Sequence, residues 1–328
     1  MNRNKEKTRP NWLDLPESLT VSVLSRLEVI EILKTAQKVC KTWHRICKDP
    51  MMWRTINICD IWVYSDSTSW HKKAKKMEKI CRHAVYRGRG NVVDISLENL
   101  GSDGLLWDIT NRSKKIRRLG LVLPNITHNG LSLVASKLPL LEELELSYSA
   151  YTTEALEAIG RHCPLLKALK LNKRHDIPYV WDGCKLARRH HHYQVFGSKK
   201  SSKGLHDDGV ALAIAGTMHC LQKLQIFGNK VTNVGLQAIL DGCPGLESLD
   251  LRRCYNLKVE GYLELRCLQR IKQLRLPDDY TDDCELVSTD EIVTNYTGLL
   301  IKIERLYDVI ILEPIEHYSF PSKSKRLR

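Results

Sequence analysis

The chain has 328 residues, of which 43% are hydrophobic and 27% charged, and its formal net charge at pH 7 is +13. That length allows two or more domains with a substantial core. No run of about 18 apolar residues occurs, and the charged start MNRNKEKTRP has no apolar segment behind it, so we expect neither a membrane span nor a secretory signal. Eleven cysteines without paired spacing predict a reducing compartment, either the cytosol or the nucleus.

Residues 10–56 predict a small, separate helical module. Leu15-Pro16 opens a helix, and apolar residues follow at helical spacing as far as Leu27. A second apolar set begins at Ile32 and ends before Asp49-Pro50. Two or three short helices in about 45 residues give only a marginal core. We therefore expect part of this apolar surface to face another protein.

Residues 57–90 predict a linker followed by a basic helix. The preceding stretch, from Trp53 to Ile58, alternates like a strand and is expected to begin a sheet. Residues 71–90 contain eight basic side chains and one acidic one, a net charge of +7. Apolar residues from Trp70 to Ala84 form one stripe at helical spacing. We interpret the helix as a cap whose lysines face water, with a nuclear-localisation or polyanion-binding patch as the alternative.

A hexad with apolar residues at positions one, four and six occurs seven times in the rest of the chain. Successive copies begin 24, 25, 25, 55, 25 and 25 residues apart, at Val92, Ile116, Leu141, Leu166, Leu221, Leu246 and Ile271. A strand buried on one face needs this alternation, and a period near 25 is typical of leucine-rich repeats. No repeat can enclose its own leucines, so neighbours must stack into one core across residues 91–284.

Two segments interrupt the repeat pattern. The 55-residue spacing equals one period plus about 30 inserted residues, at 174–206, with a net charge of +5 and a turn-rich tail. The insertion carries possible zinc ligands, but their spacing matches no zinc frame: Cys184, His190, His191, His192 and His206. We predict a basic loop there, and no metal or other cofactor. Residues 285–328 lose the hexad and are expected to form a divergent C-terminal cap or tail.

The order of residues in the helical module resembles an F-box. It reads Leu15-Pro16, Leu19, Val23-Leu24, Leu27, Ile32-Leu33, Val39-Cys40-Lys-x-Trp43, Asp49-Pro50 and Trp53. The repeat sequences HCPLLKALKL and GCPGLESLDLRRC resemble the cysteine-containing class of leucine-rich repeats. Together they make the chain similar to plant-type F-box/leucine-rich-repeat proteins. The resemblance implies an α/β chain: a small N-terminal all-α F-box, then a curved solenoid with parallel strands inside and helices outside.

That resemblance also implies a function and partners. An F-box docks the Skp-family adaptor of SCF-type cullin–RING ubiquitin ligases, and the repeats of such a receptor bind a client protein for ubiquitination. The chain would then be a non-catalytic subunit whose partners are the adaptor, through it the cullin and RING subunits, and an unknown client. The residues that would contact the adaptor, or support those contacts from the core, are Leu15, Pro16, Leu19, Val23, Leu24, Leu27, Ile32, Leu33, Val39, Cys40 and Trp43.

The concave face of the sheet is the expected client surface. Hexad positions three, five and seven should point away from the leucine core. The resulting candidates are Glu143, Glu145, Lys170, Lys223, Gln225, Phe227, Asp250, Arg252 and Arg275. Phe227 is the only aromatic residue in these rows, which predicts that it anchors the client.

Two other classes of function remain as alternatives. An enzyme is not expected, because the chain lacks the G-x-S-x-G, P-loop, H-E-x-x-H and dinucleotide motifs. A non-enzymatic scaffold or a basic nucleic-acid-binding protein would fit the charge of +13. The concave rows are mixed in sign, however, whereas a nucleic-acid groove needs a continuous basic track with interleaved aromatics, so neither nucleic acid nor a membrane is expected as a partner.

Overall fold

The computed structural model describes residues 15–59, 70–98, 100–122, 124–149, 151–173 and 208–281. Residues 1–279 form one compact unit and residues 280–328 a second. The predicted basic loop at 174–206, its possible zinc ligands, and the predicted cap or tail at 285–328 all lie outside the described residues.

The N-terminal module is entirely helical, as predicted. Its elements are α1 (Glu17–Leu24), α2 (Val29–Lys34), the 3₁₀ turn η2 (Ala36–Lys38), α3 (Lys41–Lys48) and the 3₁₀ turn η3 (Pro50–Trp53). Local sequence explains these boundaries. Glu28 and Glu31 form a capping box at the start of α2. The Asp49 carboxylate accepts a hydrogen bond from the Met51 N–H, and Pro50 occupies the first turn, where its missing N–H costs nothing.

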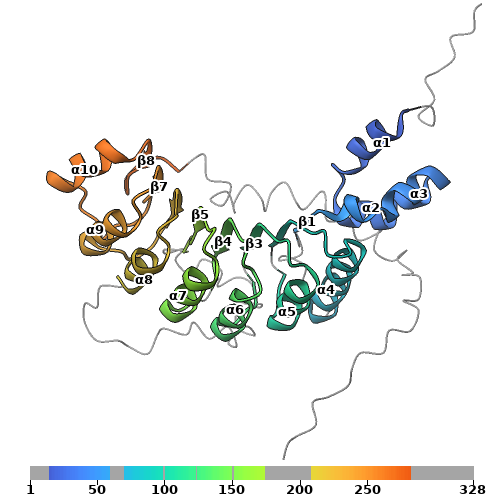
Figure 1. Cartoon of the computed structure of the whole chain (residues 1–328), viewed down its shortest axis with the longest axis horizontal. Helices are drawn as coiled ribbons and strands as arrows, with labels where there is room; N and C mark the ends of the chain where they lie inside the picture. Colours follow the sequence, from blue (N-terminus) through green and yellow to red (C-terminus); the bar gives the residue numbers. More distant parts are fainter. Residues whose placement is uncertain are drawn as a thin grey trace, which may run out of the picture. The chain divides into compact units, whose positions relative to one another are not determined.

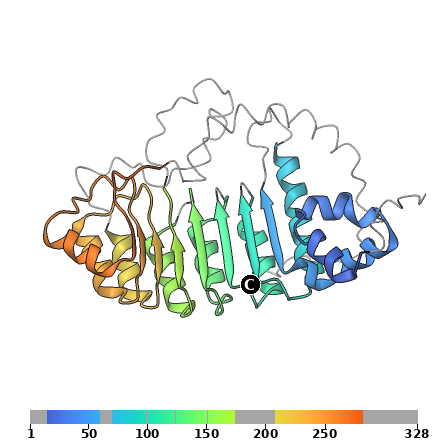
Figure 2. The ribbon, with the colours of Figure 1, turned by 90° about the horizontal axis from the view of Figure 1, so that it is seen from above.

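Each of the seven predicted hexads forms a parallel strand, and an eighth strand precedes them. The strands are β1 (Thr55–Cys59), β2 (Asp94–Glu98), β3 (Arg118–Val122), β4 (Glu143–Ser147), β5 (Ala168–Lys170), β6 (Lys223–Gln225), β7 (Ser248–Asp250) and β8 (Gln273–Arg275). They lie side by side in chain order (Figure 2). Leu169 of β5 pairs with Leu224 of β6, so the register passes unbroken across the 55-residue spacing.

Helices cover the other side of the array, one after each strand from β1 to β7. They are α4 (Trp70–Arg87), α5 (Asp103–Arg112), α6 (His128–Ala135), α7 (Thr153–His162), α8 (Gly209–Thr217), α9 (Asn233–Gly242) and α10 (Tyr262–Arg270). Figure 1 shows the strands in one layer and these helices in the other. Neighbouring strands lie about 4.8 Å apart but packed helices 8–10 Å apart, so the array must bend toward its sheet. The predicted α/β solenoid, with strands inside and helices outside, is confirmed.

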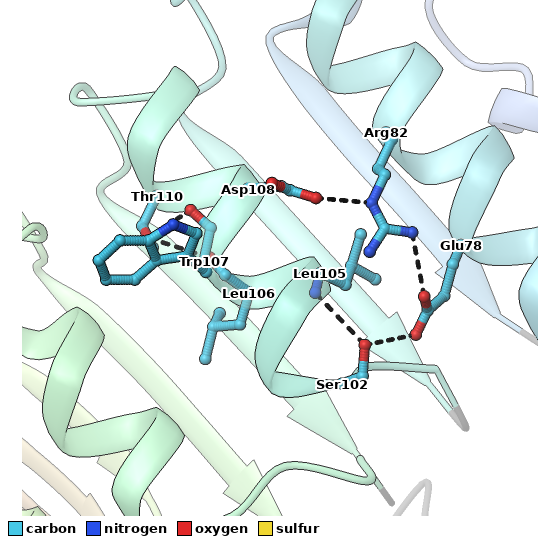
Figure 3. A network of polar contacts seen from close by, with 8 residues as sticks. All are labelled: Glu78, Arg82, Ser102, Leu105, Leu106, Trp107, Asp108 and Thr110. Carbon is cyan, nitrogen blue, oxygen red and sulfur yellow. Dashed lines mark hydrogen bonds and ion pairs between the residues drawn. The ribbon is translucent and has the colours of Figure 1, made fainter. Parts of the chain in front are cut away.

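The basic helix predicted as a cap is the helix of the first repeat. α4 follows β1 and packs beside α5. Met77, Cys81 and Ala84 of its predicted apolar stripe are buried. Its Arg82 donates to Asp108 of α5 at 2.7 Å and to Glu78 at 3.0 Å, and Glu78 in turn accepts from Ser102, the N-cap of α5 (Figure 3). Part of the predicted basic face therefore holds two repeats together.

A single hydrophobic core runs from the helical module to the last repeat. The predicted proline-associated cysteines belong to it: Cys163 and Cys243 are buried at the ends of α7 and α9. Burial raises the pKa of the Cys163 thiol to about 12, and that of Cys243 to about 11, with Arg270 opposing the second shift. Cys254, buried two repeats beyond Cys163, behaves alike, and its pKa rises to about 12.

These thiols should be protected from alkylation. A pKa near 12 leaves roughly one thiolate in ten thousand at pH 8, and the thiolate is the reactive form. Iodoacetamide at pH 8, followed by peptide mass mapping, should label the exposed Cys220 in the folded protein while leaving Cys163 and Cys254 unmodified. In urea all three should react. Equal labelling of Cys163 and Cys220 without denaturant would contradict the assigned burial.

Helices α8 and α9 approach so closely that one glycine is required. A Cβ on Gly242 would lie 2.6 Å from the Cα of Ala215, whereas one on Gly216 in α8 would meet nothing within 4 Å. Neither glycine has a positive φ, so space rather than backbone strain separates them.

Gly242→Ala should lower the free energy of unfolding by about 1–3 kcal/mol, because the helices must move apart. Gly216→Ala, the matched control, should raise it by about 0.5–1 kcal/mol, since alanine restricts the unfolded chain more than glycine. Urea denaturation of the two variants measures the contrast. If the two changes had effects of the same sign and size, α8 and α9 would not pack as closely as described.

Candidate functional site

The helical module is held to the first repeat by one tryptophan and one arginine. Trp53 is completely buried, and its indole N–H donates to the backbone carbonyl of Cys47 at 3.0 Å. Arg87, at the end of α4, lies with its guanidinium carbon 5.4 Å from the Trp53 ring centroid and donates to the Gln37 side chain at 3.0 Å. The module is therefore a packed extension of the array, and its outer surface is left for a partner.

Burial divides the eleven predicted adaptor-binding residues into three groups. Leu24 and Ile32 are buried; Leu15, Leu27, Leu33, Cys40 and Trp43 are partly buried; Pro16, Leu19, Val23 and Val39 are exposed. The prediction that Leu24 contacts a partner is wrong, because its side chain is 0% exposed. Helical spacing placed Leu24 with its apolar neighbours, but α1 turns Leu24 and Thr20 inward together.

The partly buried group supports the surface from below. Leu27, Leu33 and Trp43 pack against the core cluster. The Cys40 sulfur accepts a hydrogen bond from the Trp43 backbone N–H at 3.5 Å, which makes it the N-cap of α3. The exposed contacts left by the prediction are Leu19 at 53%, Val23 at 45% and Val39 at 55% exposure. Leucine and valine side chains exposed to this extent on one small module suit a protein interface.

Two further apolar residues of this surface were not predicted. Val21 and Met51 are exposed, and both line a cleft of about 310 Å³ between α1 and the α3–η3 segment. Glu17 and Arg45 close one side of this cleft with a two-point ion pair of 2.8 and 2.9 Å, and the bond from Arg45 lowers the pKa of Glu17. Periodicity could not find these residues, because apolar side chains lie on every side of α1.

The concave face carries the predicted client residues in two conditions. Glu143, Glu145, Lys170, Lys223, Gln225, Asp250 and Arg275 are exposed or partly exposed in hexad positions three and five. Their charges pair across neighbouring strands. Lys170 lies 3.7 Å from Glu145, as the sequence suggested, and Arg118 lies 3.7 Å from Glu143 and 3.9 Å from Asp94. Burial raises the pKa of Asp94, an effect that Arg118 opposes.

Position seven does not face solvent, which corrects the prediction for Phe227 and Arg252. Phe227 is 6% exposed, and Arg252 is 5% exposed and binds the Asp250 carboxylate at 3.0 and 2.8 Å. The hexad register itself is right, because Leu224 and Ile226 of the same repeat are in the core. Phe227 is buried outside that core, beneath Arg253, whose guanidinium carbon lies 5.4 Å from its ring centroid.

The turn after each strand explains why position seven is buried. Backbone pairing continues past the strands: the N–H of Lys173 donates to the Phe227 carbonyl at 2.9 Å, and that of Gly228 to the Arg252 carbonyl at 3.0 Å. Position eight then takes left-handed backbone at Tyr148, Gly228 and Arg253. The chain leaves the sheet there, so the side chain before the turn is enclosed by neighbouring repeats and does not stand on an open face.

Comparison with known proteins identifies both parts of the chain. The F-box-like family model matches residues 12–59. The putative F-box/LRR-repeat protein 21 of Arabidopsis thaliana is 43% identical over 84% of this chain and 85% of its own length. The chain belongs to the F-box/LRR-repeat family.

Other relatives extend the same picture. The putative F-box/LRR-repeat protein 23 of Arabidopsis thaliana is 44% identical over 89% of this chain, which spans 59% of that relative's length. The Arabidopsis F-box protein SKIP19 is 40% identical over 86% of this chain and 82% of its own length. A solved tropomodulin C-terminal domain from Caenorhabditis elegans covers 76% of the chain at 13% identity with a TM-score of 0.28, too weak a likeness to inform the fold.

The described part of this F-box/LRR-repeat protein offers binding surfaces and little else. Within it, no three His, Cys, Asp or Glu side chains come together as a metal site. Across the same ranges, no helix has the length and apolar character needed to cross a membrane.

Removing the Phe227 ring should destabilise the fold. Phe227→Ala is expected to lower the free energy of unfolding by about 3 kcal/mol, the lower end of the cost of emptying a buried aromatic site. Tyr262→Ala, at a 77% exposed aromatic residue in α10, should change it by less than about 0.5 kcal/mol. Denaturant melts of both variants give the comparison. A Phe227→Ala protein as stable as the parent chain would mean that the ring is free to serve as a client anchor.

Proposed function

We propose that this protein is the substrate-recognition subunit of an SCF-type cullin–RING ubiquitin ligase. The F-box would dock the Skp-family adaptor, and through it the cullin and RING subunits, while the repeats would bind the client protein. The observation that carries this proposal is the F-box-like module at residues 12–59, which presents exposed leucine, valine and methionine side chains beside a family-typical repeat array. In such an assembly this chain supplies proximity and other subunits supply the chemistry.

The adaptor surface proposed here has two neighbouring parts. Leu19 and Val23 lie on the exposed side of α1, and Val21 and Met51 line the adjoining cleft. Buried apolar side chains at the centre of an interface carry most of its binding energy, and charges at the rim carry little. The Glu17–Arg45 ion pair is exposed on both sides, so we assign it to holding α1 against α3 and not to affinity.

The client surface is proposed to be the concave face at hexad positions three and five. Glu143, Arg118 and Asp94 alternate in sign across three neighbouring strands, and Glu145 and Lys170 do so across two. A client that matches this pattern must present charges of both signs, since like charges brought together cost several kcal/mol. Mixed sign also disfavours the nucleic-acid alternative, which needs one continuous basic track. We place the assembly in the cytosol or the nucleus.

Adaptor binding should depend on the exposed side of α1. Leu19→Ala combined with Val23→Ala should weaken binding of a purified Skp-family adaptor at least about tenfold, because each truncation of a central apolar contact costs about 1 kcal/mol or more. Isothermal titration calorimetry of the full chain measures the affinity.

The matched control is Leu265→Ala with Leu268→Ala, two leucines of α10 that are 58% and 59% exposed. This pair should leave adaptor affinity within about twofold of the parent, since α10 lies at the other end of the array. Thermal melts should show that both doubles stay folded. The assignment fails if the adaptor does not bind the parent chain, or if the α1 double binds as tightly as the α10 double.

A further inference from the structure

Four basic side chains gather where helices α5 and α6 end. Arg112 closes α5, Lys114 and Lys115 follow it, and Lys137 stands 25 residues beyond Arg112, at the same place in the next repeat. The first three are exposed and Lys137 is partly exposed. We call these four residues the basic edge.

Neutral groups hold the basic edge in place. The Arg112 guanidinium carbon lies 5.9 Å from the ring centroid of Tyr86 on α4. The Lys137 ammonium lies 2.9 Å from the ring centroid of Trp107 on α5, whose ring points away from the Asp108–Arg82 pair (Figure 3). Each cation at the end of one helix thus leans on an aromatic ring of the helix before it.

Amide oxygens provide the remaining contacts. Lys115 donates to the Asn91 side-chain oxygen at 3.0 Å, and Lys137 donates to that of Asn111 at 2.5 Å. Burial lowers the pKa of Lys137, and the charge of nearby Lys114 lowers it further. In the ranges that the structure describes, no carboxylate lies within ion-pair distance of any of the four. Their positive charge is therefore left uncompensated.

Neighbouring cations on the same rim are neutralised. Arg117 binds Glu142 at 2.6 Å, Lys167 lies 3.5 Å from the same carboxylate, and Arg161 binds Glu157 at 3.2 Å. The positive excess is thus confined to the stretch from α4 to α6. Favourable interaction with the helix dipole accounts for Arg112 in the last turn of α5, but that effect fades beyond the last turn and does not explain Lys114 and Lys115.

We propose that the basic edge, together with Tyr86 and Trp107, binds an acidic peptide segment of a partner protein. Two helix spacings of 8–10 Å give a surface about 20 Å long, which an extended peptide of about six residues would span. Aromatic rings that fix the Arg112 and Lys137 side chains reduce the entropy lost when a carboxylate binds. This surface lies on the helical side of the array, apart from both surfaces of the proposed function.

A peptide fits this surface better than a nucleic acid does. Single-stranded nucleic acids bind by stacking bases on open aromatic faces along a basic groove. Here the cations themselves cover a face of Trp107 and of Tyr86. The basic edge also stops after two repeats, where Glu142 and Glu157 neutralise the next cations.

The test uses the full chain and a fluorescein-labelled peptide of six glutamates, followed by anisotropy at 50 mM and 200 mM salt. The parent protein should bind saturably, and more weakly at the higher salt. The triple variant Arg112→Gln, Lys114→Gln, Lys115→Gln should bind at least about tenfold more weakly. A triple control of equal charge change, Lys75→Gln, Lys79→Gln, Lys230→Gln, removes exposed lysines elsewhere and should stay within about twofold of the parent.

Three results would overturn the proposal. The first is no saturable binding of the glutamate peptide by the parent chain. The second is an equal loss in the two triple variants, which would show only a response to net charge. The third is displacement of the peptide by a ten-nucleotide single strand at a lower concentration than by unlabelled peptide, which would make the edge a nucleic-acid surface. Thermal melts that match among the three proteins exclude unfolding as the cause of any loss.

Discussion

Each repeat of this protein exposes leucines that only the next repeat can cover. Leu144 and Leu146 are buried in β4 because β3 and β5 flank them in register, and the same holds along the array. A residue buried in this way typically contributes about 1.5–3 kcal/mol relative to the exposed side chain. Because the contribution is shared between neighbours, the array cannot keep one repeat and lose the next. This constraint fixes the spacing near 25 residues, and it explains why the insertion leaves the stack between β5 and α8 without altering the β5–β6 register.

The same stacking sets the positions of polar groups. The Asp103 carboxylate accepts from both the backbone N–H and the hydroxyl of Thr127, the N-cap of α6, and Asp208 binds Thr232 in the same way. Each pair satisfies the free N–H groups at one helix start from the helix before it. The side chains on the outer and concave faces carry no such duty. Function is therefore expected on those faces and on the module that closes the first repeat.

The F-box illustrates how a small helical module can expose apolar side chains and stay folded. Trp53 and Arg87 join it to the first repeat, so the array contributes core that a module of this size lacks. Leu19, Val21 and Met51 can then remain at the surface. An adaptor and a client would meet this chain on different faces, and the basic edge offers a third. Each face can be altered by substitutions that leave the leucine core intact.

Periodicity in the sequence determined the architecture. Alternation within the hexads predicted seven strands, and their spacing predicted the parallel stack, because a strand buried on one face has only one register that hides its leucines. The apolar order of residues 10–56 predicted a helical module with a surface for a partner. Periodicity could not decide which side of α1 faces inward, since that helix is apolar all round and packing against α3 turns Thr20 and Leu24 to the core. Nor could it show that Phe227 is covered, because the left-handed turn at position eight and the Arg253 side chain come from tertiary contacts between repeats. Pairing of charges was likewise a tertiary matter: Arg117 is neutralised by Glu142, 25 residues away, whereas Lys114 and Lys115, three and two residues before it, are not.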